Sequence, residues 1–496
     1  MKEIKLFING EFRNSSNGQT FESIDPCTGE VVATVHNPSE SDINDAVEAA
    51  HNAFYSKEWS EMSRERRSEI LLTISETIKE RKRELIEEEI KDSGSTFRKA
   101  AADIHNTAAF FKVMSKVAST FSFEEEDAKA SREGFSKNKR QYTPIGVCAQ
   151  IIPWNFPLVM AAWKIGPVLA TGCTTVIKSA GETPVTASIL AEILKDSGVP
   201  NGVVNVITGG AKEGHALISH PKISKIAFTG STAVGKIILN EASKSVKKTT
   251  LELGGKSPNI VMDDADLDIA VDGALYAFLY HSGQACDSGT RLLIQEGIYD
   301  QFLAKFLSRI EQISIGQTND KNTGFGPVIS EKQFNTIMNY IEVTKKEGAK
   351  LLFGGERISG DGFDKGFFIR PTAFEISPSN TIWKEEIFGP VVGITKFKTE
   401  QEAISLANDS VYGLAAAIWT KNPEKAQRIA SKLESGTIWI NEYHLLNPGM
   451  PFGGLKQSGI GREMGVEGIL AYLEVKHIWE SDCNTREAKM WLDALF

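Results

Sequence analysis

Apolar strands alternate with helical segments through the middle of the chain, between Gly146 and Leu253. Short apolar runs that predict buried strands cover 147–152, 174–178, 203–207 and 226–229. Segments with helical spacing lie between or after them, at 158–170, 184–198 and 232–244. Because parallel strands are usually joined by crossover helices, this order predicts a parallel sheet with helices on both faces.

The pattern differs on either side of this block. Residues 6–36 read as short strands and turns, with Asn9-Gly10 as a hairpin signal. Residues 39–93 are predicted to be helical, because apolar residues recur at three- and four-residue spacings opposite a charged face. A second series of strands and helices runs over 258–440, starting with a strand at 259–262.

Residues 121–141 lack an apolar stripe that could face a core. They carry an acidic run, 124–127, and a basic run, 137–140. Taken by itself, this charge pattern predicts a solvated loop.

Composition supports a globular enzyme. With 41% hydrophobic and 24% charged residues, a chain of 496 residues can bury a large core and form two or three domains. Its net charge of −9, without a long basic block, disfavours nucleic acid or an anionic membrane as the main partner. The first residues lack the apolar core of a secretory signal, and Lys164 and Pro167 interrupt the apolar stretch 158–170.

Five cysteines, an odd number, are widely scattered at positions 27, 148, 173, 286 and 483. This spacing suggests neither a disulfide framework nor a zinc site, so no metal is expected. A reducing, cytoplasmic compartment is the expected location.

Glu252 and Cys286 are the first candidates for chemistry. Glu252 precedes Gly254-Gly255, and Cys286 lies between Gly283 and Gly289. A carboxylate in a glycine-flanked loop can act as a general base, and a cysteine between glycines can act as an exposed nucleophile. Each also has a structural interpretation, since an isolated cysteine is often a small buried hydrophobe and a strand-end glutamate is often solvated.

Several ordered motifs together resemble the aldehyde dehydrogenase superfamily. The resemblance covers nearly the whole chain and rests on the segments 8–11, 150–157, 176–178, 228–235, 251–256, 282–289, 385–390 and 451–459. It implies an α/β fold with a Rossmann-type cofactor domain, an α/β catalytic domain and a small β bridging or oligomerisation element. The implied boundaries are 1–122 and 146–254 for the NAD(P)-binding domain, 255–450 for the catalytic domain, and 123–145 with 470–496 for the bridging segments.

The resemblance also implies a role for residues 121–141. They would form projecting strands that complete a neighbouring subunit's sheet, which makes a homodimer or homotetramer the expected assembly.

The cofactor site follows from the same resemblance. The turn 228–235 joins a strand to a helix, whose free N–H groups could bind a pyrophosphate, although alone it would more often be a plain helix cap. In the family, Ser231 would bond a phosphate, Lys178 the adenosine ribose and Glu386 the nicotinamide ribose, with Phe388 packing nearby. The remaining residues expected at the cofactor are Ile152, Trp154, Gly181, Gly230, Gly235 and Leu253.

Gly181 departs from the family pattern. NAD-preferring relatives usually carry a glutamate at this position, where it bonds the ribose 2′-hydroxyl and would repel a 2′-phosphate. Glycine leaves room and no charge, although Glu182 is next in sequence. The sequence therefore predicts NAD or NADP as cofactor.

The implied chemistry assigns a task to each catalytic residue. Cys286 attacks the aldehyde as a thiolate, and the Asn155 amide and the Cys286 backbone N–H stabilise the oxyanion. Glu252 then activates water to hydrolyse the thioester, which favours a free carboxylic acid over acyl-CoA as product. Lys164 resembles a family lysine that assists proton relay, or is structurally paired inside the domain.

The aldehyde tunnel is expected to be mostly apolar, which suits medium-sized aliphatic or aromatic aldehydes. Its expected lining is Phe156, Met160, Trp163, Tyr280, Ala285, Asp287, Leu446 and Phe452, although several of these side chains would also serve as core.

Asp287 is unusual beside the nucleophile. Its charge should disfavour the Cys286 thiolate and repel anionic substrates, unless it points away and bonds backbone. Residues 476–479 resemble the betaine-aldehyde branch, but that branch prefers tryptophan where this chain has Phe452. Betaine aldehyde or an aminoaldehyde is therefore an open substrate option.

Two other classes of function remain open from the sequence. A cysteine-dependent esterase would use the same nucleophile, base and oxyanion donors, but would not need the 228–235 turn, Lys178 and Glu386 together. A non-catalytic scaffold would not need Cys286 and Glu252 intact.

Overall fold

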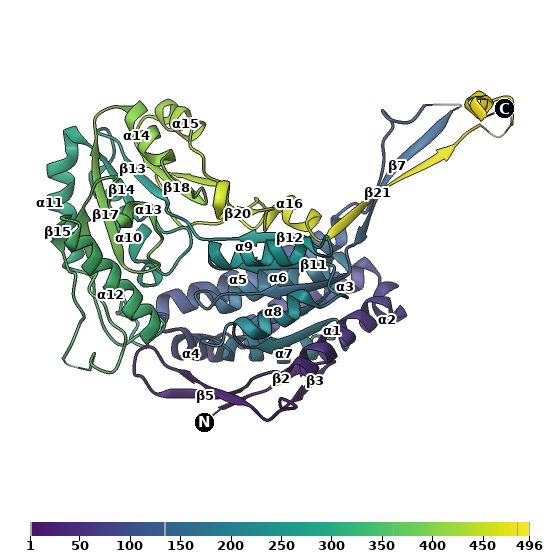
Figure 1. Cartoon of the computed structure of the whole chain (residues 1–496), viewed down its shortest axis with the longest axis horizontal. Coiled ribbons are helices and arrows are strands. Elements are labelled where there is room, and N and C mark those ends of the chain that lie inside the picture. The colour runs from purple at the N-terminus through teal and green to yellow at the C-terminus, as the bar shows by residue number, and fades with distance from the viewer. Residues whose placement is uncertain (1, 133–134, 361, 484, 496) are drawn as a thin grey trace.

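A computed structural model describes residues 2–132, 135–360, 362–483 and 485–495. Two large sheets form most of the structure. Within these residues the strands form four sheets (Figure 1). We call the two large ones sheet I and sheet II. In strand order, sheet I contains β20 (Gly459–Ile460), β12 (Lys248–Glu252), β11 (Lys225–Thr229), β8 (Val147–Ile151), β9 (Thr174–Ser179), β10 (Val204–Thr208), β2 (Leu6–Ile8) and β3 (Glu11–Arg13).

Sheet I has a parallel centre and antiparallel edges. Strands β12, β11, β8, β9 and β10 pair in parallel, whereas β2, β3 and β20 add antiparallel strands at the edges. The β2–β3 hairpin turns at Asn9 (φ 53°) and Gly10 (φ 81°), as the hairpin signal predicts.

Helices cover both faces of sheet I, because successive side chains on a strand point to opposite faces. On β9, Val176 packs in a cluster with α1 (Glu40–Tyr55), α8 (Ala211–Ser219) and α9 (Thr232–Ser243). The neighbouring Ile177 packs in the cluster of the opposite face. That face is covered by α3 (Arg64–Glu80), α4 (Lys82–Ser93), α5 (Phe97–Thr120), α6 (Pro157–Thr171) and α7 (Val185–Asp196), with α2 (Lys57–Ser60) beside them.

Sheet II repeats the arrangement. Its order is β15 (Lys350–Phe353), β16 (Thr372–Glu375), β17 (Val391–Phe397), β14 (Arg291–Gln295), β13 (Pro258–Val261), β18 (Ala415–Trp419) and β19 (Thr437–Ile440). One face packs on α10 (Leu267–Leu279) and α11 (Tyr299–Ile310). The other packs on α12 (Glu331–Lys346), α13 (Thr381–Lys384), α14 (Glu400–Asn408) and α15 (Pro423–Ala430). The short helices η1 (Tyr280–Gly283), η2 (Glu296–Ile298), η3 (Lys456–Ser458), α16 (Gly465–Leu470) and η4 (Met490–Leu495) lie in connecting or terminal segments.

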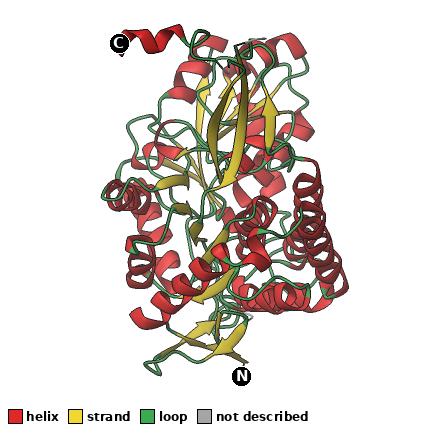
Figure 2. Ribbon diagram, turned by 90° about the vertical axis from the view of Figure 1, so that its right-hand side faces the viewer, coloured by secondary structure: helices red, strands yellow, loops and turns green. Residues whose placement is uncertain are grey.

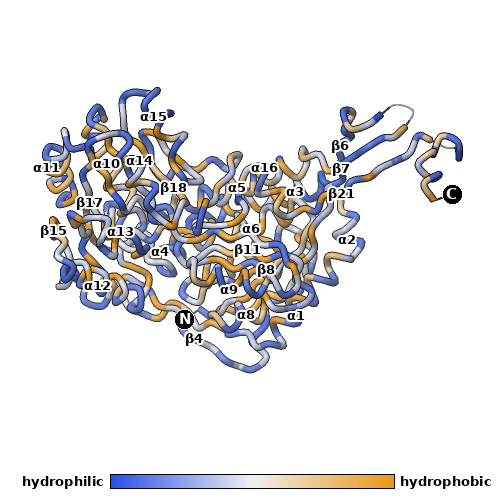
Figure 3. Tube along the Cα trace, turned by 45° about the horizontal axis from the view of Figure 1, so that its top comes forward, coloured by the Kyte–Doolittle hydropathy of each residue, from blue (hydrophilic) through white to orange (hydrophobic). Residues whose placement is uncertain are grey.

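Two small sheets lie outside this body. Strands β1 (Lys2–Ile4), β5 (Val31–His36) and β4 (Thr20–Ile24) form one of them. Strands β21 (Leu473–Ser481), β7 (Ser136–Pro144) and β6 (Glu124–Glu126) form an arm that projects from the body, with the C-terminus at its far end (Figure 1). The two termini lie at opposite ends of the molecule (Figure 2). Hydrophilic residues dominate β7, whereas hydrophobic residues gather inside the body (Figure 3).

The predicted strands and helices of the middle block are confirmed to within two residues at their ends. The helical prediction for 39–93 holds, with the segment divided into α1 to α4. Of the two interpretations of 121–141, the solvated loop is wrong and the projecting strands implied by the resemblance are present, because β6 pairs with β7 and β7 pairs with the C-terminal strand β21. In the described part of the chain, no helix is long and apolar enough to cross a membrane.

Candidate active site

Cys286 lies where the loop after η1 approaches the junction of the two sheets. His281 and Ser282 have left-handed backbone angles (φ 51° and 55°), so the chain turns sharply just before the cysteine. Of the five cysteines, all within the described chain, Cys286 alone is not buried. A Cβ added at Gly255 would lie 2.6 Å from the Cys286 carbonyl oxygen, so the loop after β12 packs directly on the nucleophile loop.

Burial raises the pKa of the Cys286 thiol well above its usual range, and the charges of Asp287, Glu386 and Glu252 raise it further. A backbone hydrogen bond from Asp287 acts in the opposite direction. The resting thiol is therefore protonated at neutral pH and needs a base, or a change of nearby charge, before it can attack.

Glu252 ends strand β12 and is buried. Among the described residues, neither of its carboxylate oxygens has a hydrogen-bond partner. Burial raises its pKa to about 8, and the positive charges of Lys164 and Arg462 only partly oppose that shift. A Cβ at Gly453 would lie 2.6 Å from Glu252 Oε1, so the glycine leaves room for the carboxylate.

Asn155 is held at both ends. Its side-chain Nδ2 donates to the Gln284 carbonyl oxygen at 2.8 Å, which ties it to the nucleophile loop. Its backbone oxygen accepts from the buried Lys99 Nζ at 2.8 Å, and Lys99 is in turn paired with Asp103 at 2.7 Å. The second Nδ2 hydrogen of Asn155 is left for another acceptor.

Lys164 lies in α6 and is fully buried. Its Nζ pairs with the carboxylate of Glu463 and donates to Thr229 Oγ1 at 2.9 Å. Burial lowers its pKa to about 7, and the charge of Glu252 opposes that shift. Glu463 was missed by the sequence analysis because it lies far along the chain and belongs to no recognised motif.

A cavity of about 900 Å³ lies at the carboxyl ends of the parallel strands of sheet I. Six of the residues predicted for the cofactor line it: Ile152, Trp154, Lys178, Gly181, Gly230 and Ser231. Ser231 is the exposed N-cap of α9. Lys178 Nζ donates to the backbone oxygens of Ser179 and Gly209, and burial lowers its pKa to about 8.

Sequence analysis missed part of this lining. Gly209, Gly210 and Glu213 follow β10, and Glu213 accepts a hydrogen bond from the Gly210 N–H at 2.8 Å. A Gly-Gly dipeptide after a predicted strand was the signal available for finding this segment.

The other four predicted cofactor residues line a different part of the same junction. A Cβ at Gly235 would lie 2.6 Å from Leu253, so α9 packs closely on the end of β12. Glu386 accepts from the Gly255 N–H at 3.1 Å, and burial raises its pKa to about 7. Phe388 packs edge-on against Trp154, with ring centroids 5.3 Å apart.

Most residues predicted for the aldehyde tunnel form an aromatic wall beside Cys286. Phe156 stacks on Tyr280 at 6.0 Å, and Trp163 packs edge-on against Phe452 at 5.7 Å. Met160 is buried in the same cluster, against which Cys286 packs. Ala285 is buried, whereas Leu446 is exposed in the 441–451 loop.

Asp287 pairs with a residue that the sequence analysis did not single out. Its Oδ1 lies 3.2 Å from His444 Nδ1, and both side chains are nearly fully buried. We expected Asp287 either to repel anionic substrates or to hydrogen-bond the backbone. The structure adds a third possibility, because Asp287 has a buried ion-pair partner.

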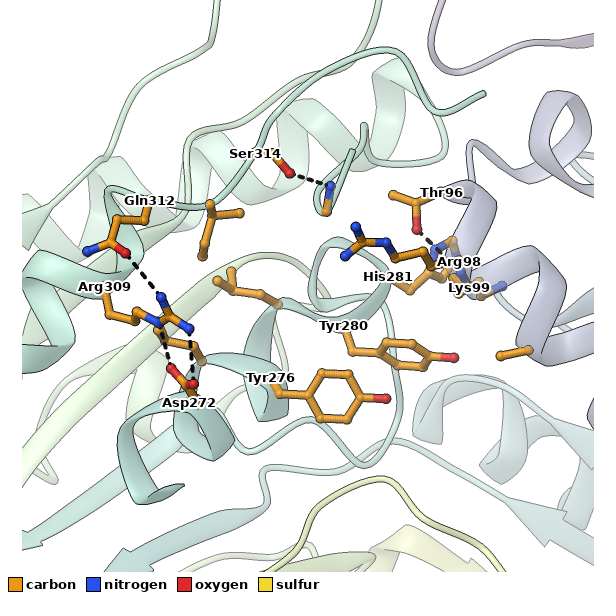
Figure 4. A pocket seen from close by; sticks show the side chains of 15 residues that line it. Thr96, Arg98, Lys99, Asp272, Tyr276, Tyr280, His281, Arg309, Gln312 and Ser314 are labelled. Atoms are coloured by element: carbon orange, nitrogen blue, oxygen red, sulfur yellow. Dashed lines mark hydrogen bonds and ion pairs between the residues drawn. The ribbon is translucent and has the colours of Figure 1, made fainter. Parts of the chain in front are cut away.

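A second cavity, of about 570 Å³, is lined by Tyr280 and by residues of α5, α10 and α11 (Figure 4). Figure 4 shows Tyr276 and Tyr280 side by side. An ion pair between Arg309 and Asp272 lies on the side of this cavity away from Lys99. Among the described residues, its lining includes neither Cys286 nor Glu252.

Comparison with known proteins identifies the family. A family model described as the aldehyde dehydrogenase family matches residues 12–478. The chain is 43% identical over 476 residues to an aldehyde dehydrogenase of Emericella nidulans, covering 95% of this chain and 94% of that protein. It is 42% identical over 492 residues to the betaine aldehyde dehydrogenase of Bacillus subtilis, covering 99% of both.

A solved structure supports the same assignment. An aldehyde dehydrogenase from Bacillus cereus in complex with NAD⁺ superimposes with a TM-score of 0.93 at 42% identity, covering 97% of both chains. The chain belongs to the aldehyde dehydrogenase family and is an oxidoreductase that acts on aldehydes.

Proposed function

We propose that this enzyme oxidises an aldehyde to the free carboxylic acid with NAD⁺ or NADP⁺, through a covalent intermediate on Cys286. The observation that carries the proposal is the convergence of three groups at one junction. A partly exposed thiol, a buried carboxylate without a partner and an amide donor meet there, beside a crevice at the carboxyl ends of parallel strands.

The crevice fits a dinucleotide. Its lining includes the exposed N-cap of α9, where free N–H groups favour binding of a phosphate. It also includes the buried Lys178, whose Nζ donates to the backbone oxygens of Ser179 and Gly209. Ser231 and the start of α9 would bind the pyrophosphate, Lys178 the adenosine ribose and Glu386 the nicotinamide ribose. When bound, the cofactor accepts the hydride that leaves the aldehyde carbon.

Cys286 and Asn155 carry out the first step. The sulfur attacks the aldehyde carbon, and the carbonyl oxygen becomes an oxyanion. The free Nδ2 hydrogen of Asn155 and the Cys286 backbone N–H stabilise it, and removal of one such donor in other enzymes costs about 3 kcal/mol.

Glu252 carries out the last step. As a carboxylate it removes a proton from water, which attacks the thioester and releases the acid and the Cys286 thiol. Neither oxygen has a hydrogen-bond partner among the described residues, which is consistent with this role because both remain available to accept a proton. Lys164 and Glu463 lie behind it as a proton-relay pair, with the Lys164 charge favouring ionised Glu252.

The aromatic wall favours medium-sized aliphatic or aromatic aldehydes, since Phe156, Met160, Trp163 and Phe452 are apolar. Betaine aldehyde is the substrate named for the Bacillus subtilis relative and is the second candidate. The two differ in charge, so their ratio of kcat/KM separates them.

Gly181 favours acceptance of both cofactors. A Cβ at this position would contact Phe21, at 3.4 Å. Gly181 therefore places no carboxylate in the space that a 2′-phosphate would occupy. The Bacillus cereus relative is a complex with NAD⁺, which supports at least NAD⁺ use.

The working enzyme is a cytoplasmic homodimer or homotetramer. The arm leaves one edge of β21 unpaired within the described chain, and Val475 and Trp479 on that strand are exposed. An exposed edge and apolar side chains favour pairing with a second copy. In the same proposal, 1–122 and 146–254 form the cofactor domain, 255–450 the catalytic domain, and 123–145 with 470–496 the bridge.

The test is the formation of NADH or NADPH, followed by absorbance with a panel of aldehydes. Cys286→Ala should abolish turnover, whereas Cys27→Ala, which replaces a buried cysteine outside the site, should not. No reduction with any aldehyde, together with retained ester cleavage, would replace the proposal by a cysteine-dependent esterase.

A further inference from the structure

His444 and Asp287 form a buried pair beside the nucleophile. His444 Nδ1 lies 3.2 Å from Asp287 Oδ1, and the two side chains are 4% and 9% exposed. His444 has a left-handed backbone angle (φ 61°), a strained conformation for a residue other than glycine. The backbone of the 441–451 loop is therefore strained at the residue that places its imidazole against Asp287.

The surroundings of the imidazole show where its hydrogens would lie. His444 Nε2 lies 3.2 Å from the carbonyl oxygen of Ala277, which can only accept, so Nε2 carries a hydrogen. Nδ1 lies 3.2 Å from Asp287 Oδ1 in an ion-pair contact, so a hydrogen on Nδ1 would face a carboxylate oxygen, whereas a lone pair there would face an anion. With a hydrogen on both nitrogens, the imidazolium and the carboxylate form a pair of zero net charge.

This charge balance matters for Cys286. Asp287 follows the nucleophile directly, and its negative charge opposes formation of the thiolate more than that of Glu386 or Glu252. The Tyr443 hydroxyl donates to the Asp287 backbone oxygen at 2.8 Å, so the residue is also fixed in place. With Asp287 neutralised, the thiolate forms next to a neutral pair instead of a second anion.

We propose that His444 is a positioning residue for Cys286, which acts by neutralising Asp287 and so makes thiolate formation easier. The proposal rests on the proposed function, in which Cys286 is the nucleophile.

The tyrosines around the pair stay neutral over the relevant range. Tyr276 of α10 and Tyr280 of η1 pack against His444, with ring centroids 5.4 and 5.2 Å away. Burial raises the pKa of both tyrosines and of Tyr443. Two carboxylates, Glu442 and Asp103, also raise the Tyr276 pKa.

The experiment measures alkylation of Cys286 by iodoacetamide across a pH series, with the labelled cysteine identified by peptide mass spectrometry. It needs neither aldehyde nor cofactor, so a failure of the proposed function alone would not affect it. The proteins compared are wild type, His444→Asn, Asp287→Asn and the double variant. His444→Asn retains a donor for Asp287 but no charge.

The pair account predicts that His444→Asn raises the alkylation pKa of Cys286 by about one unit, which slows labelling about ten-fold at a fixed pH below it. Asp287→Asn should remove the effect of the histidine, so that the double variant labels faster than His444→Asn. Equal alkylation pKa values in wild type and His444→Asn would overturn the proposal. So would a double variant as slow as His444→Asn, because that result would indicate packing instead of charge.

Discussion

At the residue scale, the proposed role of Glu252 predicts that its ionisation limits when water can be activated. Its pKa of about 8 is raised by burial, so the carboxyl is mostly protonated at pH 7 and cannot accept a proton. Where hydrolysis is rate-limiting, kcat should therefore rise with pH until pH exceeds about 8. A kcat profile that is flat across this range in the wild type would contradict the assignment of Glu252 as the base.

A second prediction at this scale concerns Asn155. Replacement by alanine removes one donor to the oxyanion, so kcat should fall by about 10²–10³-fold with a small change in KM. Steady-state kinetics with one aldehyde measures both constants. Asn17→Ala provides a control, since that exposed side chain bonds only a neighbouring turn. A loss expressed mainly in KM would indicate a role in substrate binding instead.

The sequence predicts residues that lie in local motifs and misses those that fold topology brings together. Cys286, Glu252 and Asn155 each have distinctive neighbours, so their chemistry is recognisable before folding. Glu463 reaches Lys164 from 299 residues away, and His444 pairs with Asp287 across the catalytic loops. No periodicity or spacing indicates these partners, because the contacts depend on how sheets I and II pack.

At the element scale, we expect the turn after β9 to set the cofactor preference. Gly181→Glu should place a carboxylate where a 2′-phosphate would lie, and so lower kcat/KM for NADP⁺ relative to NAD⁺ by at least about ten-fold. The ratio is measured with one aldehyde and both cofactors. Glu182→Gln tests the neighbouring carboxylate, and a larger effect there than at Gly181 would mean that Glu182 governs discrimination.

The strands differ in how well the hydrophobic pattern of the sequence predicts them. The buried parallel strands of sheet I are short apolar runs between turn residues, and their positions follow from the sequence. The arm cannot be predicted from the hydrophobic pattern, because β6 is charged and exposed and β7 is charged and only partly buried. The pairing partner of β7 is β21, near the C-terminus. Because this pairing is made by backbone hydrogen bonds, the side-chain pattern does not indicate it.

At the scale of the whole molecule, the arm predicts self-association. Val475→Asp with Trp479→Asp places two charges on the exposed strand β21, so the mass measured by light scattering should fall toward that of a single chain of 54.4 kDa. Val411→Asp is the matched control, since it changes an exposed valine on the body. An unchanged mass in the arm variant would place the interface elsewhere.

The central claim is that Cys286 carries the acyl group that Glu252 hydrolyses. Its most direct test is mass spectrometry of the Glu252→Gln variant after mixing with an aldehyde and NAD⁺ or NADP⁺. The account predicts one equivalent of reduced cofactor and an acyl adduct on the Cys286 peptide that persists, because water activation is lost. Full turnover without an accumulating adduct, or an adduct on another residue, would contradict it.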